Sequence, residues 1–397
     1  MLELSKIIEQ VDAMSQELVQ RQALYRRLLD NARQALIDFD HVDDTLRKKI
    51  DRAQEVDPTW RGAYPCDLSL NARFIPPPTK ENASLIAVDG SQIYPNRHGP
   101  ALYYLINTGV IILRQGTGEA PVVDTHPQVF YSENDLYDNN LNLLNTQMVN
   151  SARELEEMRQ LAYSAEQERQ HFGGDLDHLI VAMTDGPLLI WISEEERSAA
   201  GEKAAQERVR AYLQQLQRIK QSQAIPIGYV ARPRSANVLR LLHVAQLEIE
   251  DITKESVRAS RYRALTDATL FSNLAPNQRT ALFKSTARVN KRFADDGHEI
   301  CFFYINVSRH KGAPHIARVD IPKWAAEQPQ MLDRVHSAIY GDCDGTDYPY
   351  TLIRAHELAL VTHQERQELE NMLAIAYMRL TGDNLSASVK EELKRNF

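Results

Sequence analysis

Hydrophobic residues recur every three or four positions along the first forty residues of the chain. From Leu4 to Phe39 these positions follow a 4-3 spacing, with Ser15 and Gln22 as polar interruptions. This spacing places the apolar side chains on one face of a long amphipathic helix. A helix of this kind can form half of a helical hairpin, a dimer seam or a lid, and packing within the chain is the default among these.

Prolines follow this helix and interrupt the helical pattern. Pro58, Pro65 and the run Pro76–Pro78 favour an extended connection, because proline lacks the backbone donor that a helix requires. We therefore predict an N-terminal helical segment with its connection over residues 1–80 and a second domain over residues 81–397.

Two short apolar runs predict buried strands that each end at an Asp-Gly turn. The first run covers residues 84–89 and the second covers residues 179–185. Between them, residues 101–114 predict two strands that meet near Gly109, and residues 141–170 show helical spacing. The first Asp-Gly motif is therefore followed by an antiparallel meander and then by a helix.

Helices and strands continue to alternate after the second run. We predict helices over residues 194–219, 238–247, 279–293 and 350–380, and strands over residues 225–230, 301–307 and 316–321. A meander followed by interleaved helices and strands predicts an α/β fold, with a mixed sheet flanked by helices.

Composition is that of a globular protein, with 43% hydrophobic and 25% charged residues. The longest apolar runs are shorter than the roughly 20 residues that span a bilayer, and the N-terminus does not resemble a secretory signal. We therefore expect a cytoplasmic protein without a membrane helix. The three cysteines, which lie far apart in the sequence, predict reduced thiols rather than a disulfide framework or a zinc site.

The formal net charge of −8 argues mildly against a protein that coats nucleic acid, because phosphate binding needs a locally positive surface. Basic clusters nevertheless occur, among them Arg232, Arg234 and Arg240. An enzyme that grips DNA in a narrow channel is compatible with both observations, and so is a solvated helix face.

Asp89 and Asp185 are the residues around which chemistry is expected. Each Asp-Gly pair alone fits an ordinary tight turn equally well. Both aspartates, however, lie at the carboxyl ends of predicted strands, the edge at which ligands commonly bind in open α/β sheets. Two such carboxylates and one from a helix can hold hard divalent cations through oxygen ligands.

The order of several short motifs resembles the NurA nuclease family, in the bacterial type that carries an N-terminal helical extension. The motifs run from residue 84 to about residue 375 and are Ala-Val-Asp-Gly-Ser at 87–91, Asp-Gly-Pro-Leu at 185–188, Arg-Pro at 232–233, Phe-Phe-Tyr at 302–304, His-Ile-Ala-Arg at 315–318, Tyr-Pro-Tyr at 348–350, and His356. The resemblance implies a ribonuclease-H-like core. It also implies a DNA nuclease, both exonuclease and endonuclease, that requires Mn²⁺ or Mg²⁺.

The resemblance further implies that Asp89 and Asp185 are metal ligands and that a glutamate on the intervening helix joins them. The family pattern of an arginine, a glutamate four residues later and then Leu-Ala selects Glu157, counted from Arg153. Glu154 is the alternative, because it lies three residues earlier on nearly the same helix face.

Tyr348 and His356 match the tyrosine and histidine of the family's active site. His356 could ligate metal, position the attacking water or protonate the leaving oxygen, since histidine exchanges protons near neutral pH. Tyr348 could donate to a phosphate oxygen. Candidate contacts to the DNA backbone are Ser91, for which capping of the turn is the alternative, and Gln92, Arg232 and Arg234.

These residues together predict phosphodiester hydrolysis with two metal ions clamping the attacking and departing oxygens. The resemblance implies a homodimer that acts in DNA end processing with a HerA-type hexameric ATPase. The chain itself contains no Gly-x-x-x-x-Gly-Lys-Ser/Thr motif for an ATP-driven motor. Two other functions stay open: a ribonuclease on the same fold, and an inactive adaptor of such an ATPase.

Overall fold

The computed structural model describes residues 3–77, 82–138, 141–190, 202–309, 312–383 and 385. These residues form two compact units. Unit 1 contains Met1–Pro78, Gly186–Ile190 and Gly228–Asp347, and unit 2 contains Thr79–Asp185, Trp191–Ile227 and Tyr348–Phe397. The domain boundary near residue 80 stays a prediction.

The sheet of unit 2 combines a meander with one parallel strand. Its strands are β3 (Ala83–Ile93), β4 (Tyr104–Arg114), β5 (Val122–Phe130) and β6 (Leu179–Asp185). Strand β4 pairs antiparallel with both β3 and β5, whereas β6 pairs parallel with β3, which gives the order β5–β4–β3–β6. The predicted α/β class with a mixed sheet is confirmed.

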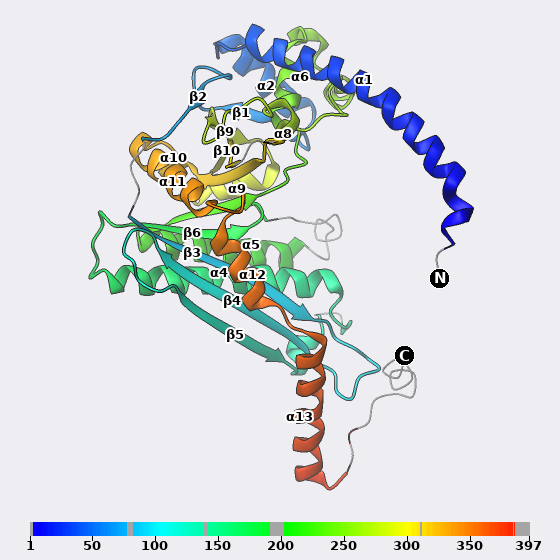
Figure 1. The fold of residues 1–397 in the computed structure, drawn as a ribbon, viewed down its shortest axis with the longest axis vertical. Coiled ribbons are helices and arrows are strands. Elements are labelled where there is room, and N and C mark those ends of the chain that lie inside the picture. Colours follow the sequence, from blue (N-terminus) through cyan, green and yellow to red (C-terminus); the bar gives the residue numbers. More distant parts are fainter. Residues whose placement is uncertain are drawn as a thin grey trace. The chain divides into compact units, whose positions relative to one another are not determined.

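Helices α4 (Thr146–His171) and α12 (Tyr350–Ala359) pack on opposite faces of this sheet (Figure 1). A side chain added at Gly90 of β3 would collide with α4, and one added at Gly109 of β4 would collide with α12. Gly109 is the cross-strand partner of Asp89, the residue next to Gly90. Since neighbouring residues of a strand point to opposite faces, these two contacts assign the helices to opposite sides of the sheet.

Three further helices of unit 2 complete this arrangement, namely α3 (Glu133–Leu136), α5 (Glu202–Gln221) and α13 (His363–Thr381). Helix α5 packs against α4. Leu369 and Leu373 of α13 pack against a small core formed by Ile93, Tyr103 and Leu105. The beginning of α13 is thereby fixed to the ends of β3 and β4.

The strands of unit 1 follow the order β1–β9–β10–β11–β7, with β8 paired to β10 and β2 paired to β8. They are β1 (Ala63–Pro65), β2 (Arg73–Phe74), β7 (Ile225–Val230), β8 (Arg279–Thr280), β9 (Phe283–Ser285), β10 (Ile300–Asn306) and β11 (Ile316–Pro322). Strand β7 crosses the unit boundary, and its residues from Gly228 to Val230 pair with β11.

Helices surround these strands, among them a long N-terminal helix as predicted. They are η1 (Leu4–Ile7), α1 (Ile8–Asp38), α2 (Asp44–Val56), α6 (Asn237–Ala245), η3 (Ile249–Asp251), α7 (Lys254–Arg258), α8 (Asp267–Leu270), α9 (Arg288–Asp295), α10 (Lys323–Ala326) and α11 (Pro329–Asp342). The end of α1, α2 and α6 share one hydrophobic core with β9 and β10. No described helix of the chain is long and apolar enough to span a membrane.

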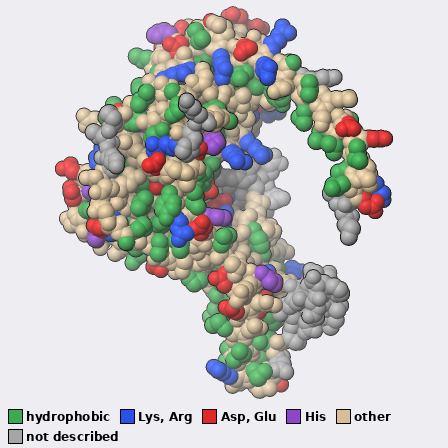
Figure 2. Space-filling view, in the orientation of Figure 1, with side chains coloured by type: hydrophobic (Ala, Val, Ile, Leu, Met, Phe, Trp, Pro, Cys, Tyr) green, Lys and Arg blue, Asp and Glu red, His purple; other side chains and the backbone are tan. Residues whose placement is uncertain are grey.

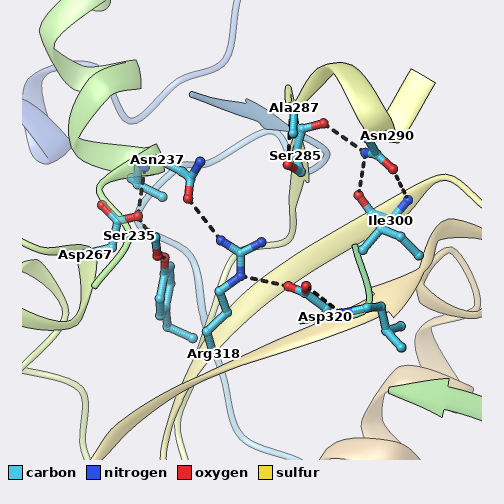
Figure 3. Close-up of polar contacts among 12 residues, drawn as sticks. Ser235, Asn237, Asp267, Ser285, Ala287, Asn290, Ile300, Arg318 and Asp320 are labelled. Carbon is cyan, nitrogen blue, oxygen red and sulfur yellow. Dashed lines mark hydrogen bonds and ion pairs between the residues drawn. The ribbon is translucent and has the colours of Figure 1, made fainter. Parts of the chain in front are cut away.

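A buried polar network fixes the interior of unit 1 (Figure 3). The carboxylate of Asp267 accepts hydrogen bonds from the first two amides of α6 that follow Asn237, at 3.0 Å each, and from the hydroxyl of Tyr304 at 2.7 Å. Arg318 donates to Asp320 at 2.7 Å and to the side chain of Asn237 at 3.0 Å. The residues of the matched Phe-Phe-Tyr and His-Ile-Ala-Arg motifs that lie here, Tyr304 and Arg318, are therefore structural in this unit.

Several predicted elements have different bounds in the structure. Of residues 101–114, Tyr104–Arg114 form one strand, β4, because Gly109 continues the extended pairing with β3 instead of turning the chain. Residues 279–293 are not one helix but two short strands and α9. Residues 350–380 are two helices that Leu360–Thr362 separate. The first part of the predicted helix over residues 194–219 lies outside the described residues.

Two of the cysteines are spatial neighbours although 235 positions separate them. The sulfur of Cys66, which follows β1, lies 3.9 Å from the sulfur of Cys301 on β10. Both are free thiols. The spacing in the sequence gave no indication of this contact, because β9 brings the two strands together.

Candidate active site

Asp89 lies within strand β3, not at its end. The strand continues to Ile93, and Asp89, Gly90 and Ser91 pair in turn with Gly109, Thr108 and Asn107 of β4. The predicted Asp-Gly turn at this position is therefore wrong. Asp89 instead projects from the interior of the sheet toward α12, on the face that Gly109 leaves open to this helix.

His356 of α12 meets Asp89 on that face. Its Nδ1 atom lies 2.6 Å from Oδ2 of Asp89, a distance at which the imidazole donates a strong hydrogen bond to the carboxylate. The side chain of His356 is 62% exposed, whereas that of Asp89 is 14% exposed. The carboxylate thus holds one nitrogen of the ring, and the other nitrogen remains for water or a substrate.

Asp185 ends strand β6, as predicted, and Gly186 follows with a φ of 126°, a conformation that glycine adopts readily. Val88 of β3 is paired with Thr184 of β6, so Asp89 and Asp185 are the next residues of two neighbouring parallel strands. Residues in register on such strands point to the same face. The two aspartates therefore come together beside α12.

Tyr348 approaches Asp185 from the segment that precedes α12. Desolvation raises the pKa of Asp185, and the negative charge of Asp89 raises it further. The hydrogen bond from Tyr348 and the charge of His356 act in the opposite direction. Four of the predicted site residues thus meet on this face as two pairs: Asp89 with His356, and Asp185 with Tyr348.

Glu157 of α4 reaches the same strand from the other face. Its carboxylate is buried, and a Cβ atom placed on Gly90 would lie 2.6 Å from Oε1 of Glu157. Glycine at position 90 is therefore what allows the glutamate to approach β3. Burial raises the pKa of Glu157 to about 8; Arg153 opposes this effect, and the charges of Asp89, Glu154 and Asp185 add to it.

The competing carboxylate, Glu154, faces another partner. It lies 3.6 Å from Arg208 of α5 in an ion pair, and its side chain is more exposed than that of Glu157. Glu157 is therefore the more buried of the two glutamates, and the charges of Asp89 and Asp185 act on its carboxylate. The metal-binding role of either residue stays a prediction.

Arg153 has a role in the site that the sequence did not reveal. Its Nη1 atom donates to the carbonyl oxygen of Gly90 at 3.0 Å and lies 3.3 Å from Oε1 of Glu157. In the sequence Arg153 served to select Glu157 through the family pattern, and its position one helical turn before that glutamate places both on one helix face. Arg153 thereby joins α4 to β3 at the carboxylate.

The predicted DNA contacts have varied surroundings. The hydroxyl of Ser91 donates to the carbonyl oxygen of Ala359, which ties β3 to the end of α12 and leaves no turn for it to cap. Gln92 donates to the hydroxyl of Tyr94 at 2.7 Å. The remaining two candidates, Arg232 and Arg234, are exposed residues of unit 1. DNA binding by these residues stays a prediction.

The donor set suits a hard divalent cation. Asp89, Glu157 and Asp185 offer carboxylate oxygens, and Oε1 of Glu157 is a buried oxygen that accepts no hydrogen bond from the described residues. The guanidinium of Arg153 offsets part of the negative charge at Glu157. Within the described ranges, however, no three such side chains already form an assembled metal-ligand cluster. The carboxylates approach β3 from two faces, so side-chain rotation would have to complete a shared site.

A known protein family matches the segment that contains these site residues. A family model described as the NurA domain matches residues 83–361. A search of curated proteins finds no match.

Three solved structures are similar to this chain at low sequence identity. The NurA nuclease from Sulfolobus solfataricus is 12% identical, over 96% of this chain and 98% of that one, with a TM-score of 0.48. Endonuclease V from Ciona intestinalis, solved with a 24mer DNA, is 12% identical over 82% of this chain and 96% of that one, with a TM-score of 0.32. The catalytic domain of human endonuclease V is also 12% identical, over 89% and 98%, with a TM-score of 0.30.

The family match alone covers well over half of the chain. It begins at the first residue of β3 and ends two residues after α12, and it therefore contains all five predicted active-site residues. The chain belongs to the NurA domain family.

Proposed function

We propose that this protein is a metal-dependent nuclease that hydrolyses phosphodiester bonds of DNA. One observation carries the proposal: Asp89 and Asp185 directly follow the paired residues Val88 and Thr184 on neighbouring parallel strands, and His356 and Tyr348 contact them. Structural polar pairs seldom gather three mutually repelling carboxylates around one strand. Such clusters are a feature of sites whose working charge includes a bound cation.

Asp89, Glu157 and Asp185 are the residues that would hold divalent metal, Mn²⁺ or Mg²⁺, with His356 as a further candidate. A bound divalent ion supplies Lewis acidity to the phosphate and stabilises charge on the attacking and leaving oxygens. We propose two such ions per site on the basis of the family resemblance.

The side chains of the protein would then position the substrate and exchange protons with it. Asp89 fixes the orientation and the tautomer of His356, so that the exposed ring can exchange a proton with water or with the leaving oxygen. Tyr348 holds Asp185 and provides a hydroxyl at the edge of the site. Glu157 sits in a buried position where an uncompensated charge is unfavourable, which favours cation binding at this carboxylate.

The test is a cleavage assay with labelled single-stranded and double-stranded DNA and RNA, each with Mn²⁺, Mg²⁺ or chelator. We expect metal-dependent degradation of DNA. Asp89→Ala and Asp185→Ala should each lower the rate by at least about 100-fold, because each removes a charged group from the reacting centre. Activity that survives both substitutions would exclude this site.

Glu157→Gln and Glu154→Gln form a matched pair on the same helix. The first should abolish cleavage and weaken Mn²⁺ binding measured by calorimetry, whereas the second should leave both close to the wild-type level. The opposite result would assign the helical carboxylate to Glu154. Cleavage of RNA instead of DNA would support the ribonuclease alternative, and binding of an ATPase without cleavage of either would support the adaptor.

We further propose that the protein acts in the cytoplasm as a homodimer, in DNA end processing, with a HerA-type hexameric ATPase. The family resemblance supports this, together with the lack of a P-loop motif in the sequence. The measurement is the rate of degradation of long double-stranded DNA with and without such an ATPase and ATP. An unchanged rate and no co-purification would contradict the partnership.

A further inference from the structure

The first two-thirds of α1 carry an apolar stripe that no described part of the chain covers. Among the described side chains of this helix, only Ala32, Ala35 and Leu36 are buried, all near its C-terminal end. Large hydrophobic residues before them are exposed: Leu4 by 66%, Ile8 by 58%, Val11 by 44%, Met14 by 55%, Leu18 by 54%, Val19 by 69% and Tyr25 by 38%. Figure 2 shows hydrophobic side chains distributed along this helix.

The stripe has the period of a helix seam. Leu4 of η1 and Ile8, Val11, Leu18 and Tyr25 of α1 lie on a repeat that alternates four and three residues, the repeat by which one helix packs along another. Ser15 and Gln22 occupy the two remaining positions of this repeat. A patch that suited a globular partner would not need this repeat over so many turns. The period therefore indicates a second helix of comparable length as the occupant.

The distribution of charge along α1 indicates which helix packs against it. Residues 8–17 of α1 contain three acidic residues and no basic one, a net charge of −3, whereas residues 18–29 contain three arginines and no acidic residue, a net charge of +3. A parallel copy of the helix would place like charges side by side. An antiparallel copy would place each acidic half against a basic half.

We propose that α1 pairs with α1 of a second copy of this chain as an antiparallel helical pair. The seven exposed side chains of the stripe present roughly 700 Å² per chain, or on the order of 1,400 Å² for two, within the range of stable protein interfaces. The pairing that overlaps the whole stripe sets Ile8 opposite Tyr25 and Ser15 opposite Leu18. This deepens the proposed homodimer but does not depend on nuclease activity, because association is measured without substrate.

Sedimentation of the full chain over a dilution series is the first test, with two leucines as a matched pair. Leu18 is in the stripe, and Leu24, exposed by a similar 56%, lies about 120° away around the helix. Leu18→Glu would place two buried charges in the pair and should raise the dimer dissociation constant by at least about 100-fold. Leu24→Glu should leave it unchanged. A wild-type monomer at all concentrations, or equal effects of the two changes, would overturn the proposal.

Orientation has its own test. Arg21→Glu combined with Arg26→Glu turns the second half of the stripe negative, which should weaken an antiparallel pair and strengthen a parallel one. In addition, chains with Ile8→Cys mixed with chains with Tyr25→Cys should form an oxidised cross-link between positions 8 and 25, located by mass spectrometry, that neither chain forms alone. Cross-linking of each chain with itself would establish the parallel arrangement and refute the inference.

If the chain proves to be a dimer without nuclease activity, the proposed function fails and this inference stands. If it cleaves DNA as a monomer, the inference fails and the proposed function stands.

Discussion

Two glycines on opposite sides of one strand pair allow the packing of the active site to be tested separately from its chemistry. Gly90 and Gly109 both lie in extended strands, so alanine is compatible with either backbone and would reduce the entropy of the unfolded chain by up to about 1 kcal/mol. The two substitutions differ in what the added methyl group would contact. We therefore expect Gly90→Ala to lower mainly the activity and Gly109→Ala to lower mainly the stability.

At Gly90 the methyl group would meet side chains. It would lie 2.6 Å from Oε1 of Glu157 and 2.9 Å from Cγ of Arg153, both of which can rotate away. Their displacement costs about 1–2 kcal/mol, and the lower entropy of the unfolded chain with alanine largely offsets this cost. We therefore expect the free energy of unfolding of Gly90→Ala to lie within about 1 kcal/mol of the wild-type value. The variant should nevertheless lose most of its nuclease activity, because Glu157 is moved.

At Gly109 the methyl group would meet backbone. It would lie 2.5 Å from the amide nitrogen of Ala359 and 2.6 Å from the carbonyl oxygen of Ala355, so the whole of α12 must shift. Overpacking of this kind costs about 3 kcal/mol or more. Hydrogen exchange of β4 and α12 amides measures the loss locally, without assuming that the two units unfold together. Full activity in Gly90→Ala, or equal stability of the two variants, would refute this reasoning.

Three further substitutions test polar contacts within unit 1 and within unit 2. Asp267→Ala leaves Tyr304 and two buried amides without their acceptor, and we expect a loss of about 3–5 kcal/mol in urea unfolding, whereas a loss below about 1 kcal/mol would contradict the role of the network. Arg169→Met removes the donor to four backbone carbonyl oxygens, those of Asp175, His178, Ser222 and Gln223, and should cost about 2–4 kcal/mol; an unchanged midpoint would be inconsistent with this. The hydrogen bond from Arg258 lowers the pKa of Asp57 to about 2, so its stabilisation is present above pH 4 and is lost as the pH falls toward 2. Because Arg258 is exposed and solvent screens the pair, we expect a small effect, and Asp57→Asn should remove this pH dependence from acid unfolding curves.

The elements with a clear period were predictable from the sequence. The long helix near the N-terminus, strand β6 with its terminal Asp185 and the strand pair β10–β11 agree with the pattern of hydrophobic residues. The prediction of a helix over residues 279–293 was wrong because each strand there has only two or three residues, too few to show a period of two. Their conformation is determined by pairing with β1 and β10, which a local pattern does not contain.

The site residues differ in how they could be found. Asp89 and Asp185 follow from apolar runs that precede them, and this signal is local. The contacts of His356 with Asp89 and of Tyr348 with Asp185 join residues that are 267 and 163 positions apart, so spacing could not pair them. Resemblance of short motifs selected these residues, and the geometry then related them to the aspartates.

The same dipeptide has two different physical roles in this chain. At position 186 glycine serves its conformational role, since its φ of 126° turns the chain after β6. At position 90 the backbone is extended and glycine serves by its lack of a side chain, which lets Glu157 and Arg153 reach the strand. An Asp-Gly motif after an apolar run therefore does not by itself distinguish the end of a strand from a point where a helix packs closely. The distinction came from the opposite strand, where Gly109 admits α12 beside Asp89.

This close packing also explains why the chemistry and the association of the chain can be separated. All five predicted active-site residues belong to unit 2 and to the segment that the NurA domain matches, where two glycines set the approach of α4 and α12. The exposed stripe of α1 belongs to unit 1 and precedes that segment. A substitution such as Leu18→Glu therefore changes no residue that contacts the carboxylates. It follows that any loss of activity it causes on DNA would report a requirement for the dimer and not damage to the site.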